Sequence, residues 1–350
     1  MKSNYKQLGQ FIRQVDVRNS EGKEENLLGV SVQKKFIPSI ANTVGTDFKK
    51  YKVVKKGQFT YIPDTSRRGD KIGIALLEDY EEGLVSNVYT VFEIIDEKQL
   101  IPEYLMLWFS RPEFDRYARF KSHGSVREVM DWDEMCNVEL PVPPYEKQKE
   151  IVDGYKAITE RIALKQKIND NLESMLTAVY FEQFYSSKAS EYTKLSDLMV
   201  FGNGKSRPKT NGTIPVYGGN GVLSYTDKYN AENTVLIGRV GAYCGSVYLE
   251  QSICWVSDNA IFAKSKITND EFFDYFLLKG LNLFNHHVGT GQQLLTQDIL
   301  NNIEVPKPDI DQIGMFNMKA KSVFETISAN KCEIIRLQKL SDLLLARLAS

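Results

Sequence analysis

The sequence has few of the residues that build metal centres or disulfide frameworks. Its 350 residues include 3 histidines and 4 cysteines, and the cysteines (Cys136, Cys244, Cys254, Cys332) form no CxxC pair. Structural zinc sites take four Cys or His ligands at short spacings, so the composition argues against zinc. His286 and His287 stand together without a neighbouring cysteine or carboxylate cluster, and we expect no metal site. Scattered cysteines favour free thiols in a reducing cytoplasm.

Long apolar runs and an excess of charge are also missing. No segment is apolar over the length that a membrane span needs, and Met1–Lys6 lacks the apolar core of a signal peptide. We therefore expect a cytoplasmic protein without a membrane partner. The formal net charge is -1, which argues against binding nucleic acid by bulk charge alone. Any nucleic-acid binding must come from local clusters or be shared with a partner.

What the chain does contain is an internal duplication. At one constant offset, six residues of the first half are identical to six of the second: Gly124, Asp133, Asn137, Glu139, Pro141 and Pro143 fall on Gly289, Asp298, Asn302, Glu304, Pro306 and Pro308. Each copy then continues into a long segment of periodic apolar residues. A repeat of this kind predicts two similar units in the order domain, helix, domain, helix.

Both long segments follow a heptad pattern, which is typical of a coiled-coil seam. The seam residues that we predict are Ile151, Tyr155, Ile158, Ile162, Ile168, Leu172 and Met175 in the first copy, and Phe316, Val323, Ile327, Ile334 and Leu337 in the second. Lys165 and Asn330 occupy matching polar places, where a slipped partner would bury them unpaired. A helix of roughly 40 residues is about 60 Å long, more than a compact domain needs. We predict that the two helices pair antiparallel; the alternative is that each lies on a separate core.

The remaining sequence predicts an α+β fold with short strands. In the first half we expect strands at 51–54, 58–62, 71–76 and 85–92 and a helix at 102–120; in the second half, a strand at 234–241 and a helix at 270–283. The predicted boundaries are a domain at 1–144, a helix at 145–187, a domain at 188–308 and a helix at 309–350.

Two short motifs resemble catalytic sites and lack a necessary residue. Pro143-Pro144-Tyr145 ends like the Asn/Asp-Pro-Pro-Tyr motif of amino-methyltransferases, but Val142 stands where the amide or carboxylate belongs. Gly204-Lys205-Ser206 ends like a phosphate-binding loop, but Met199 replaces its first glycine. We predict no catalytic centre in this chain.

Polar loops are better explained as DNA contacts. Base edges are read by forked or amide side chains, while Lys, Ser and Thr fix the protein on phosphates. The candidates in the first half are Lys34, Lys35, Ser66, Arg67, Arg68, Lys71, Lys121, His123, Ser125 and Arg127. The candidates in the second half are Lys205, Ser206, Arg207, Lys209, Tyr217, Asn220, Arg239, Tyr243, Gln292 and Gln293. Glycines beside Tyr217, Asn220 and Arg239 would let the backbone approach a phosphate, or they form tight turns.

Over its whole length the chain resembles the specificity (S) subunit of type I restriction-modification enzymes. The residues that carry the resemblance are Pro215–Gly221 (PVYGGNG), Gly238–Gly241 (GRVG) and the repeated Pro-x-Pro helix starts followed by Gln148 and Gln312. The resemblance implies two target-recognition domains separated by two antiparallel coiled-coil helices, related by a pseudo-twofold. It implies that each domain reads one half of a bipartite duplex DNA target and that the helices fix the distance between the halves.

The same resemblance implies partners and cofactors. Two modification subunits would carry S-adenosylmethionine and methylate adenine, and restriction subunits, where present, would use ATP and Mg. This chain would then be non-catalytic, with no cofactor of its own. The residues alone leave open a different class of protein, a duplicated interaction scaffold whose loops bind a protein partner.

Overall fold

The computed structural model describes residues 5–40, 45–65, 71–122, 128–185, 191–289 and 291–348. These residues form two compact units. The first unit combines Met1–Leu164 with Glu333–Ser350, and the second is Lys165–Cys332. Each long helix therefore contributes one half to each unit. The domain boundaries predicted at 144, 187 and 308 stay predictions.

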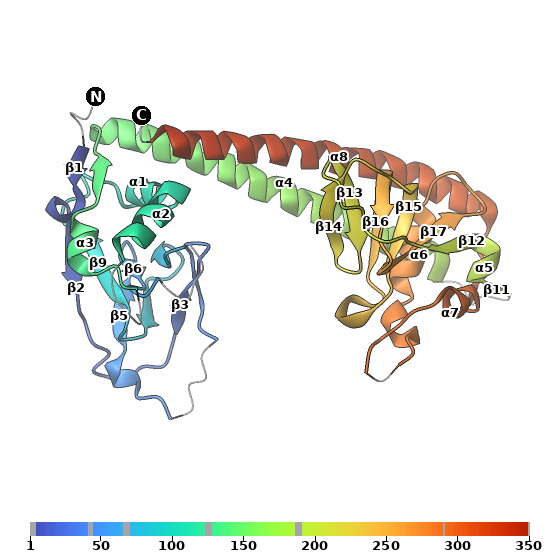
Figure 1. Cartoon of the computed structure of the whole chain (residues 1–350), viewed down its shortest axis with the longest axis horizontal. Coiled ribbons are helices and arrows are strands. Elements are labelled where there is room, and N and C mark those ends of the chain that lie inside the picture. Colours follow the sequence, from blue (N-terminus) through green and yellow to red (C-terminus); the bar gives the residue numbers. More distant parts are fainter. Residues whose placement is uncertain are drawn as a thin grey trace. The chain divides into compact units, whose positions relative to one another are not determined.

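The first unit is built from short strands and short helices (Figure 1). The strands are β1 (Tyr5–Gln7), β2 (Ile12–Val15), β3 (Leu28–Val30), β4 (Phe36–Pro38), β5 (Lys52–Lys55), β6 (Phe59–Tyr61), β7 (Ile74–Leu76), β8 (Glu82–Val85), β9 (Thr90–Ile94) and β10 (Glu139–Pro141). The helices are η1 (Leu8–Gln10), η2 (Phe48–Lys50), α1 (Pro102–Phe109), α2 (Pro112–Lys121) and α3 (Trp132–Cys136). A four-stranded sheet has the order β2-β9-β6-β7, and three further strand pairs are β1-β10, β3-β4 and β5-β8.

Aromatic packing between the sheet and α1 forms the centre of the first unit. Phe59 of β6 and Phe92 of β9 stack at 4.9 Å between ring centroids. Phe109 of α1 meets both rings edge-on, at 5.9 Å and 6.4 Å. All three rings are fully buried, and aromatic pairs of this kind stabilise a core beyond the apolar area that they bury.

Two predicted elements of the first unit are each interrupted in the structure. The strand predicted at 85–92 is two strands, because a turn closed by the bond from Tyr89 N to Ser86 O (3.1 Å) lets the chain leave the β5-β8 pair and join the four-stranded sheet. The helix predicted at 102–120 is α1 and α2, because Pro112 begins the second helix and holds Arg111 in an extended conformation.

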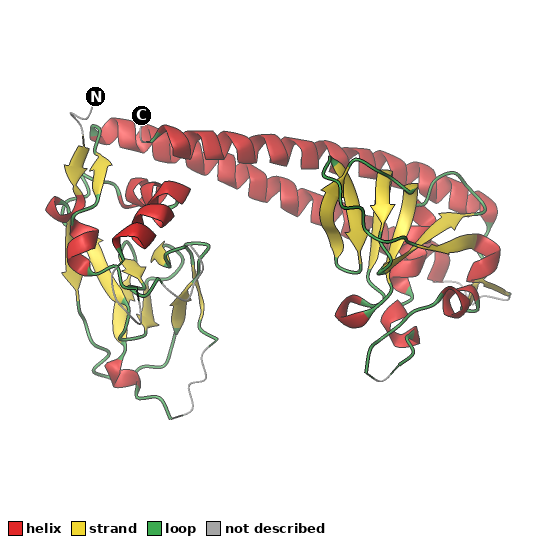
Figure 2. Ribbon diagram, in the orientation of Figure 1, coloured by secondary structure: helices red, strands yellow, loops and turns green. Residues whose placement is uncertain are grey.

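The second unit contains one six-stranded sheet in the order β12-β17-β15-β16-β13-β14. Its strands are β11 (Tyr192–Lys194), β12 (Met199–Asn203), β13 (Ile214–Gly218), β14 (Gly221–Thr226), β15 (Ala231–Gly238), β16 (Val247–Val256), β17 (Ala260–Ser265) and β18 (Glu304–Pro306). Its short helices are α5 (Leu195–Leu198), η3 (Gly241–Tyr243), α6 (Phe272–Gly280), η4 (Leu283–His286) and α7 (Gln297–Asn301). Figure 2 shows the strands of this unit gathered into a sheet with helices beside it. The strands pair mostly antiparallel, in agreement with the predicted α+β class.

The duplication predicted from sequence is present in the backbone pairing. In the first unit β1 pairs antiparallel with β10, and Tyr5 lies opposite Pro141. In the second unit β11 pairs antiparallel with β18, and Tyr192 lies opposite Pro306. The next residue donates its N–H across each pair, from Leu8 to Val138 O and from Leu195 to Ile303 O, at 2.8 Å and 3.0 Å. Both units thus attach the start of their domain to the segment that leads into a long helix.

The two long helices are α4 (Tyr145–Tyr185) and α8 (Ile310–Arg347). In the first unit, Leu345 of α8 and Leu348, just after its end, share a core with Ile151 and Tyr155 of α4. In the second unit, Tyr180 of α4 packs on Phe316 of α8, with ring centroids 5.8 Å apart. The amino-terminal half of α4 therefore meets the carboxy-terminal half of α8 in one unit, and the reverse holds in the other, so the helices pair antiparallel in both. Among the described residues, no helix is long and apolar enough to cross a membrane.

The seam of α4 departs from the prediction after Lys165. Ile168 and Met175 are exposed, while Asn169 and Leu176 are covered. The sequence prediction places the next seam residue three positions after Lys165, at the apolar Ile168. In the structure the next seam residue lies four positions after Lys165, at Asn169, as the alternation of three- and four-residue steps requires. Asn169 is accepted there because its side-chain oxygen receives a hydrogen bond from Asn330 Nδ2 at 2.8 Å. The other predicted seam residues of both helices are buried or half-buried in their units.

Candidate nucleic-acid interface

Four loops of the second unit converge at one end of its sheet. The β13-β14 turn is joined to the loop after β15 by the bond from Ser246 Oγ to Gly219 O (2.5 Å). Arg239 N donates to Asn259 O at 3.0 Å, which links this loop to the β16-β17 turn. Gly241 N donates to Gln293 O at 3.0 Å, which adds the loop after η4. Two backbone bonds and one serine hydroxyl therefore hold the four segments together, and none of these bonds uses a side chain predicted to contact DNA.

This loop cluster brings together five of the residues predicted from sequence. Asn220, Tyr243 and Gln292 are exposed, and Arg239 and Gln293 are half-buried. Amides and a guanidinium are the side chains that read base edges through paired hydrogen bonds. An exposed phenol ring can pack on a base or sugar and donate its hydroxyl to a phosphate. The cluster thus offers groups for base reading on a backbone frame that is fixed by its own hydrogen bonds.

The glycines of the cluster mostly serve the frame itself. A Cβ added at Gly238 would lie 2.1 Å from Tyr243 O, and one at Gly245 would lie 2.5 Å from Phe284 N. Gly289 adopts φ +92, and its Cβ would meet Gln292 O at 2.4 Å. These positions need glycine because two segments of backbone lie in contact there and leave no room for a Cβ atom. Only Gly241, among the glycines of this cluster, has both a positive φ (+71) and open space around the Cβ position.

A basic loop lies beside the cluster, on the other side of the β16-β17 turn. Lys205 N donates to Val256 O at 3.0 Å, and Trp255 Nε1 donates to Lys205 O at 3.3 Å. The exposed side chains of this loop are Lys205, Ser206, Arg207 and Lys209. Its lysines and arginine can therefore contact phosphates next to the amide-rich cluster.

Tyr217 is the predicted contact of the second unit that the structure places elsewhere. Its hydroxyl donates to Glu250 Oε2 at 2.9 Å, and its ring packs with Tyr248 within the sheet. Burial raises the pKa of Tyr217, and the Glu250 carboxylate adds to the rise. We therefore assign Tyr217 to the sheet and no longer propose it as a DNA contact.

In the first unit the structure argues against Lys34 as a phosphate contact. Its ammonium group lies 2.6 Å from Asp115 Oδ1 and 2.5 Å from Phe109 O, and both charged side chains are about nine-tenths buried. Burial lowers the pKa of Lys34, which its bond to Asp115 opposes. The backbone at Lys34 is left-handed, with φ +61. Lys34 anchors the β3-β4 turn to α1 and α2 and has no charge to offer to DNA.

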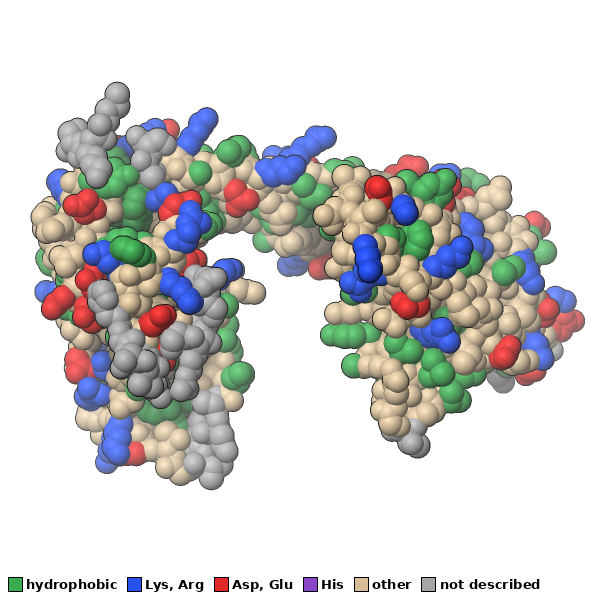
Figure 3. All heavy atoms as spheres, viewed as in Figure 1, with side chains coloured by type: hydrophobic (Ala, Val, Ile, Leu, Met, Phe, Trp, Pro, Cys, Tyr) green, Lys and Arg blue, Asp and Glu red, His purple; other side chains and the backbone are tan. Residues whose placement is uncertain are grey.

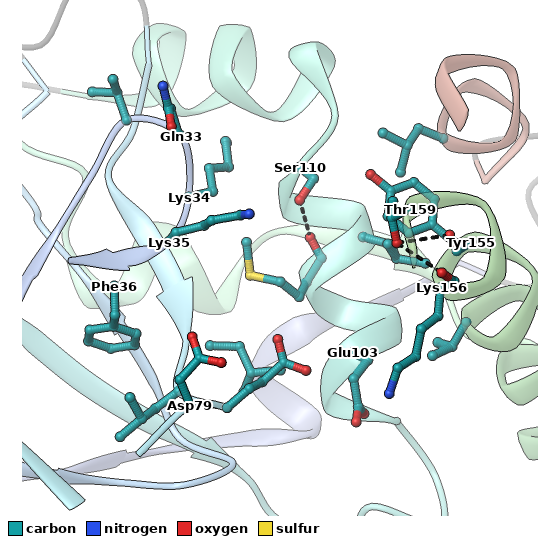
Figure 4. A pocket seen from close by; sticks show the side chains of 18 of the residues that line it. Gln33, Lys34, Lys35, Phe36, Asp79, Glu103, Ser110, Tyr155, Lys156 and Thr159 are labelled. Carbon is teal, nitrogen blue, oxygen red and sulfur yellow. Dashed lines mark hydrogen bonds between the residues drawn. The ribbon is translucent and has the colours of Figure 1, made fainter. Parts of the chain in front are cut away.

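A cavity of about 710 Å³ lies beside this anchor, between the β3-β4 turn, α1 and α4. Figure 4 shows Lys34 and Lys35 on one side of it, with Asp79 and Glu103 nearby and Tyr155, Lys156 and Thr159 of α4 opposite. Lys71 also lines the cavity. Burial raises the pKa of Glu78, another lining residue, and the charges of Glu103 and Asp79 raise it further. With acids among its cations, the cavity has no charge preference for phosphate.

The other residues of the first unit that were predicted to contact DNA do not form a cluster among the described residues. Lys35 and Lys71 are exposed, and Lys121 lies 3.5 Å from Glu134 in an ion pair. Ser66, Arg67, Arg68, His123, Ser125 and Arg127 lie outside the described residues. Figure 3 shows basic and acidic side chains interspersed on the face that it draws of each unit, in keeping with the near-zero net charge.

The sequence interpretation missed an exposed aromatic residue of the loop cluster. Phe284 of η4 lies against the Gly245 backbone and is exposed, and the His287 ring lies 4.8 Å from its own. The nearest signal in the sequence is the His286-His287 pair, which by itself suggests a metal site rather than an exposed aromatic residue. In the part of the chain that the structure describes, no three His, Cys, Asp or Glu side chains gather to hold a metal ion.

Comparison with known proteins gives a curated relative for part of the chain and solved structures of similar fold for nearly all of it. A curated relative, the specificity subunit of the type I restriction enzyme HindI from Haemophilus influenzae, is 25% identical over 135 residues, which are 38% of this chain and 29% of that protein. The S subunit of a type I restriction-modification system from M. genitalium has a similar fold, with a TM-score of 0.63, 15% identity and coverage of 99% of this chain and 96% of that one.

A second solved structure of similar fold is a chain from a structural study of complex assembly and conformational transition of the type I R-M system. It matches with a TM-score of 0.50 and 18% identity over 98% of this chain and 96% of that one. At these identities the two solved structures establish the fold alone.

The family match is more extensive. The sequence model described as the type I restriction modification DNA specificity domain matches twice, at residues 8–174 and 188–340. Each match contains one copy of the duplication, with its domain and most of its long helix. Since the two matches together cover most of the chain, the protein belongs to the family of type I restriction modification DNA specificity domains.

Proposed function

We propose that this chain is the recognition subunit of a type I restriction-modification complex and reads a duplex DNA target in two separate parts. Each unit carries one domain for one half-site. The observation that supports this best is the duplication itself, since the same strand pairing attaches a domain to a long helix in both units. A duplicated recognition protein suits a DNA target in two parts. The same strand pairing attaches each domain to its long helix, while the loops of the two domains differ and can contact different sequences.

In the second unit, the loop cluster is the reading surface that we propose. Asn220, Arg239 and Gln292 would contact base edges, while Arg207 and Lys209 would hold phosphates. Lys35, Lys71 and Lys121 remain as candidates in the first unit, where they are the predicted residues that keep exposed or half-exposed ammonium groups.

The long helices would also serve as docking surfaces for two modification subunits. Each unit leaves large apolar side chains of α4 and α8 exposed: Tyr145, Leu164, Ile335, Leu340 and Leu343 in the first unit, and Ile168, Met175, Ile310, Met315 and Met318 in the second. Tyr145 and Ile310 occupy matching places in the duplication, and so do Met175 and Leu340. Matching apolar positions on two helices fit two copies of the same partner. S-adenosylmethionine would bind to those partners, and ATP with Mg to restriction subunits where present.

The experiment is a selection from a randomised duplex library by this chain purified in complex with a type I modification (methyltransferase) subunit. We expect a two-part motif with a fixed gap. Recovery of the complex without any enrichment at low salt would contradict the proposal and favour the protein-interaction scaffold.

Two variants sharpen the same experiment. Gln292→Ala removes a base-reading amide, so we expect a changed preference in one half-site only. Lys209→Ala removes a phosphate contact, so we expect weaker binding to all sequences and a salt dependence reduced by about one counterion. The two variants serve as controls for each other, because each should leave the other's readout unchanged.

A further inference from the structure

Gln148 is a fully buried amide near the start of α4 in the first unit. Its Oε1 accepts a hydrogen bond from Ile101 N at 2.9 Å, at the start of α1. Its Nε2 donates to Gln99 O and to Pro143 O, both at 2.8 Å. The side chain therefore joins the long helix, the segment before α1 and the proline turn in three directions.

Asn317 does the same in the second unit from α8. It is 3% exposed. Its Oδ1 accepts from Phe273 N at 2.8 Å, in the first turn of α6. Its Nδ2 donates to Thr268 Oγ1 and Asp270 O, both at 3.0 Å, in the segment before that helix. Each unit thus has one buried amide on a long helix that accepts one N–H from a domain helix and donates to the segment that precedes it.

The two amides do not occupy matching places in the duplication. The register that places Pro143 on Pro308 places Gln148 on Ile313, so Asn317 lies about one helical turn further along. Gln312, which follows the second Pro-x-Pro motif as Gln148 follows the first, is exposed. The arrangement therefore recurs in the second unit from a residue that the sequence repeat does not predict, which indicates that both units require it.

An amide in this position restrains the domain more narrowly than an apolar contact does. Apolar packing is non-directional, and neighbouring side chains can slide or repack around it. Three hydrogen bonds from one planar group hold only at one rotation and one height along the helix. Loss of the amide would also leave a buried N–H and carbonyl groups without partners, unless the domain shifts to hydrate them.

We propose that Gln148 and Asn317 are positioning residues, each of which locks its recognition domain onto its long helix in one orientation and thereby restricts the DNA target to one gap length. This inference rests on the proposed function of the chain as a reader of a two-part target. Neither residue touches DNA in this proposal.

The test is the same library selection with Gln148→Met and Asn317→Leu, which remove the hydrogen bonds at nearly constant volume. We expect both half-site sequences to be unchanged and the gap to broaden from one length to two or more. The double variant should broaden it further. A single, unchanged gap in folded Gln148→Met and Asn317→Leu would overturn the proposal.

Control variants separate positioning from stability. Val91→Ala and Leu236→Ala truncate buried residues in clusters that contain no residue of α4 or α8. They lower the melting temperature of each unit and should keep the single gap. Gln148→Asn is a milder change that retains the amide. If Gln148→Met does not fold, the gap selected by Gln148→Asn tests the proposal for the first unit instead. A wild-type complex that selects no two-part motif would refute the proposed function instead, so the two failures are distinct.

Discussion

Lys34 and Asp115 form an enclosed ion pair that connects the β3-β4 turn to the helices of the first unit. Asp115 Oδ1 also accepts from Ile72 N at 3.2 Å, so the carboxylate holds a second loop in place. Removing one partner of a buried pair leaves the other charge desolvated without compensation, which costs about 3–5 kcal/mol. We therefore expect Lys34→Met to lower the free energy of unfolding of the first unit by about 3 kcal/mol, measured by urea denaturation.

Lys35→Met is the matched control, since it changes the adjacent lysine, whose side chain is exposed. Its unfolding free energy should stay within about 0.5 kcal/mol of wild type. The salt dependence of DNA binding gives the second readout, and Lys34→Met should leave it unchanged. A reduced salt slope for Lys34→Met with normal stability would restore Lys34 as a phosphate contact.

Asp274 of α6 is a buried acid in the core of the second unit, 1% exposed. Burial raises its pKa, and the neighbouring Glu271 carboxyl raises it further. Lys264 lies 3.3 Å from Glu271 Oε1. The other polar groups that face the pair come from Ser265 of β17 and Tyr180 of α4.

The folded unit therefore binds a proton at Asp274 over a pH range in which the unfolded chain, with an Asp pKa of about 3.9, has lost it. Stability then falls as pH rises from about 4 up through the raised pKa, because the unfolded state binds fewer protons there. Asp274→Asn removes the titration. We expect its melting temperature to exceed that of wild type at pH 9 and to depend less on pH between 5 and 9. A parallel pH profile for both proteins would contradict this prediction.

At the residue scale, the sequence shows which kind of side chain is present, but it does not show whether that side chain is buried or exposed. Lys34 and Lys35 are adjacent and chemically identical, yet one anchors a turn and the other is exposed. The difference depends on Asp115, far along the chain, and a distant partner leaves no local signal. Arg239, Asn220 and Gln292 were predicted because they carry forked or amide side chains in polar loops, and the structure brings these loops together.

At the scale of the elements, the pairing of α4 and α8 includes one polar layer in the second unit. Lys165 Nζ donates to Asn330 Oδ1 at 2.8 Å, and Asn330 Nδ2 donates to Asn169 Oδ1 at 2.8 Å. A polar layer of this kind lowers stability and selects one register, because a slipped helix would bury these groups against apolar residues. Replacing all three residues by Leu should raise the unfolding midpoint and admit helices slipped by one heptad.

Slippage can be measured by cross-linking. Arg161 and Glu333 form an ion pair across the helices in the first unit. Cysteines at these two positions, with Cys332 replaced by Ser, should cross-link nearly completely when the polar layer is intact. In the triple-Leu background a fraction of the chains should fail to cross-link. Complete cross-linking in both backgrounds would show that apolar packing alone sets the register.

Elements could be predicted where a periodic pattern of apolar residues extends over many residues. The prediction failed where a single residue interrupts that pattern. The heptads predict two long helices, and the structure contains them as α4 and α8. The register after Lys165 was wrong because Asn169 lies in the seam, where an apolar residue was expected. In the domains, Pro112 divides a predicted helix, and a turn at Ser86 divides a predicted strand between two sheets. Sheet assignment depends on contacts far apart in sequence, which strand periodicity does not contain.

At the scale of the whole molecule, the duplication implies that the reading surfaces and the distance between them are separate properties. The domains would determine the half-sites, and the paired helices would determine the gap. The boundary between the two compact units falls inside both helices, after Leu164 in α4 and after Cys332 in α8. Seven residues inserted at each of these points would lengthen both helices by one heptad and keep the seam in register.

One added heptad lengthens a helix by about 10.5 Å, which corresponds to about three base pairs of DNA at 3.4 Å each. We expect the selected gap to grow by about three base pairs with both half-site sequences unchanged. Three base pairs also rotate the second half-site by about 100° around the duplex, since a full turn takes about 10.5 base pairs. Binding at the new gap should therefore be weaker than that of wild type. The same seven residues appended after Ser350 should leave the gap unaltered, and an unchanged gap in the double insertion would show that the helices do not set the distance between the half-sites.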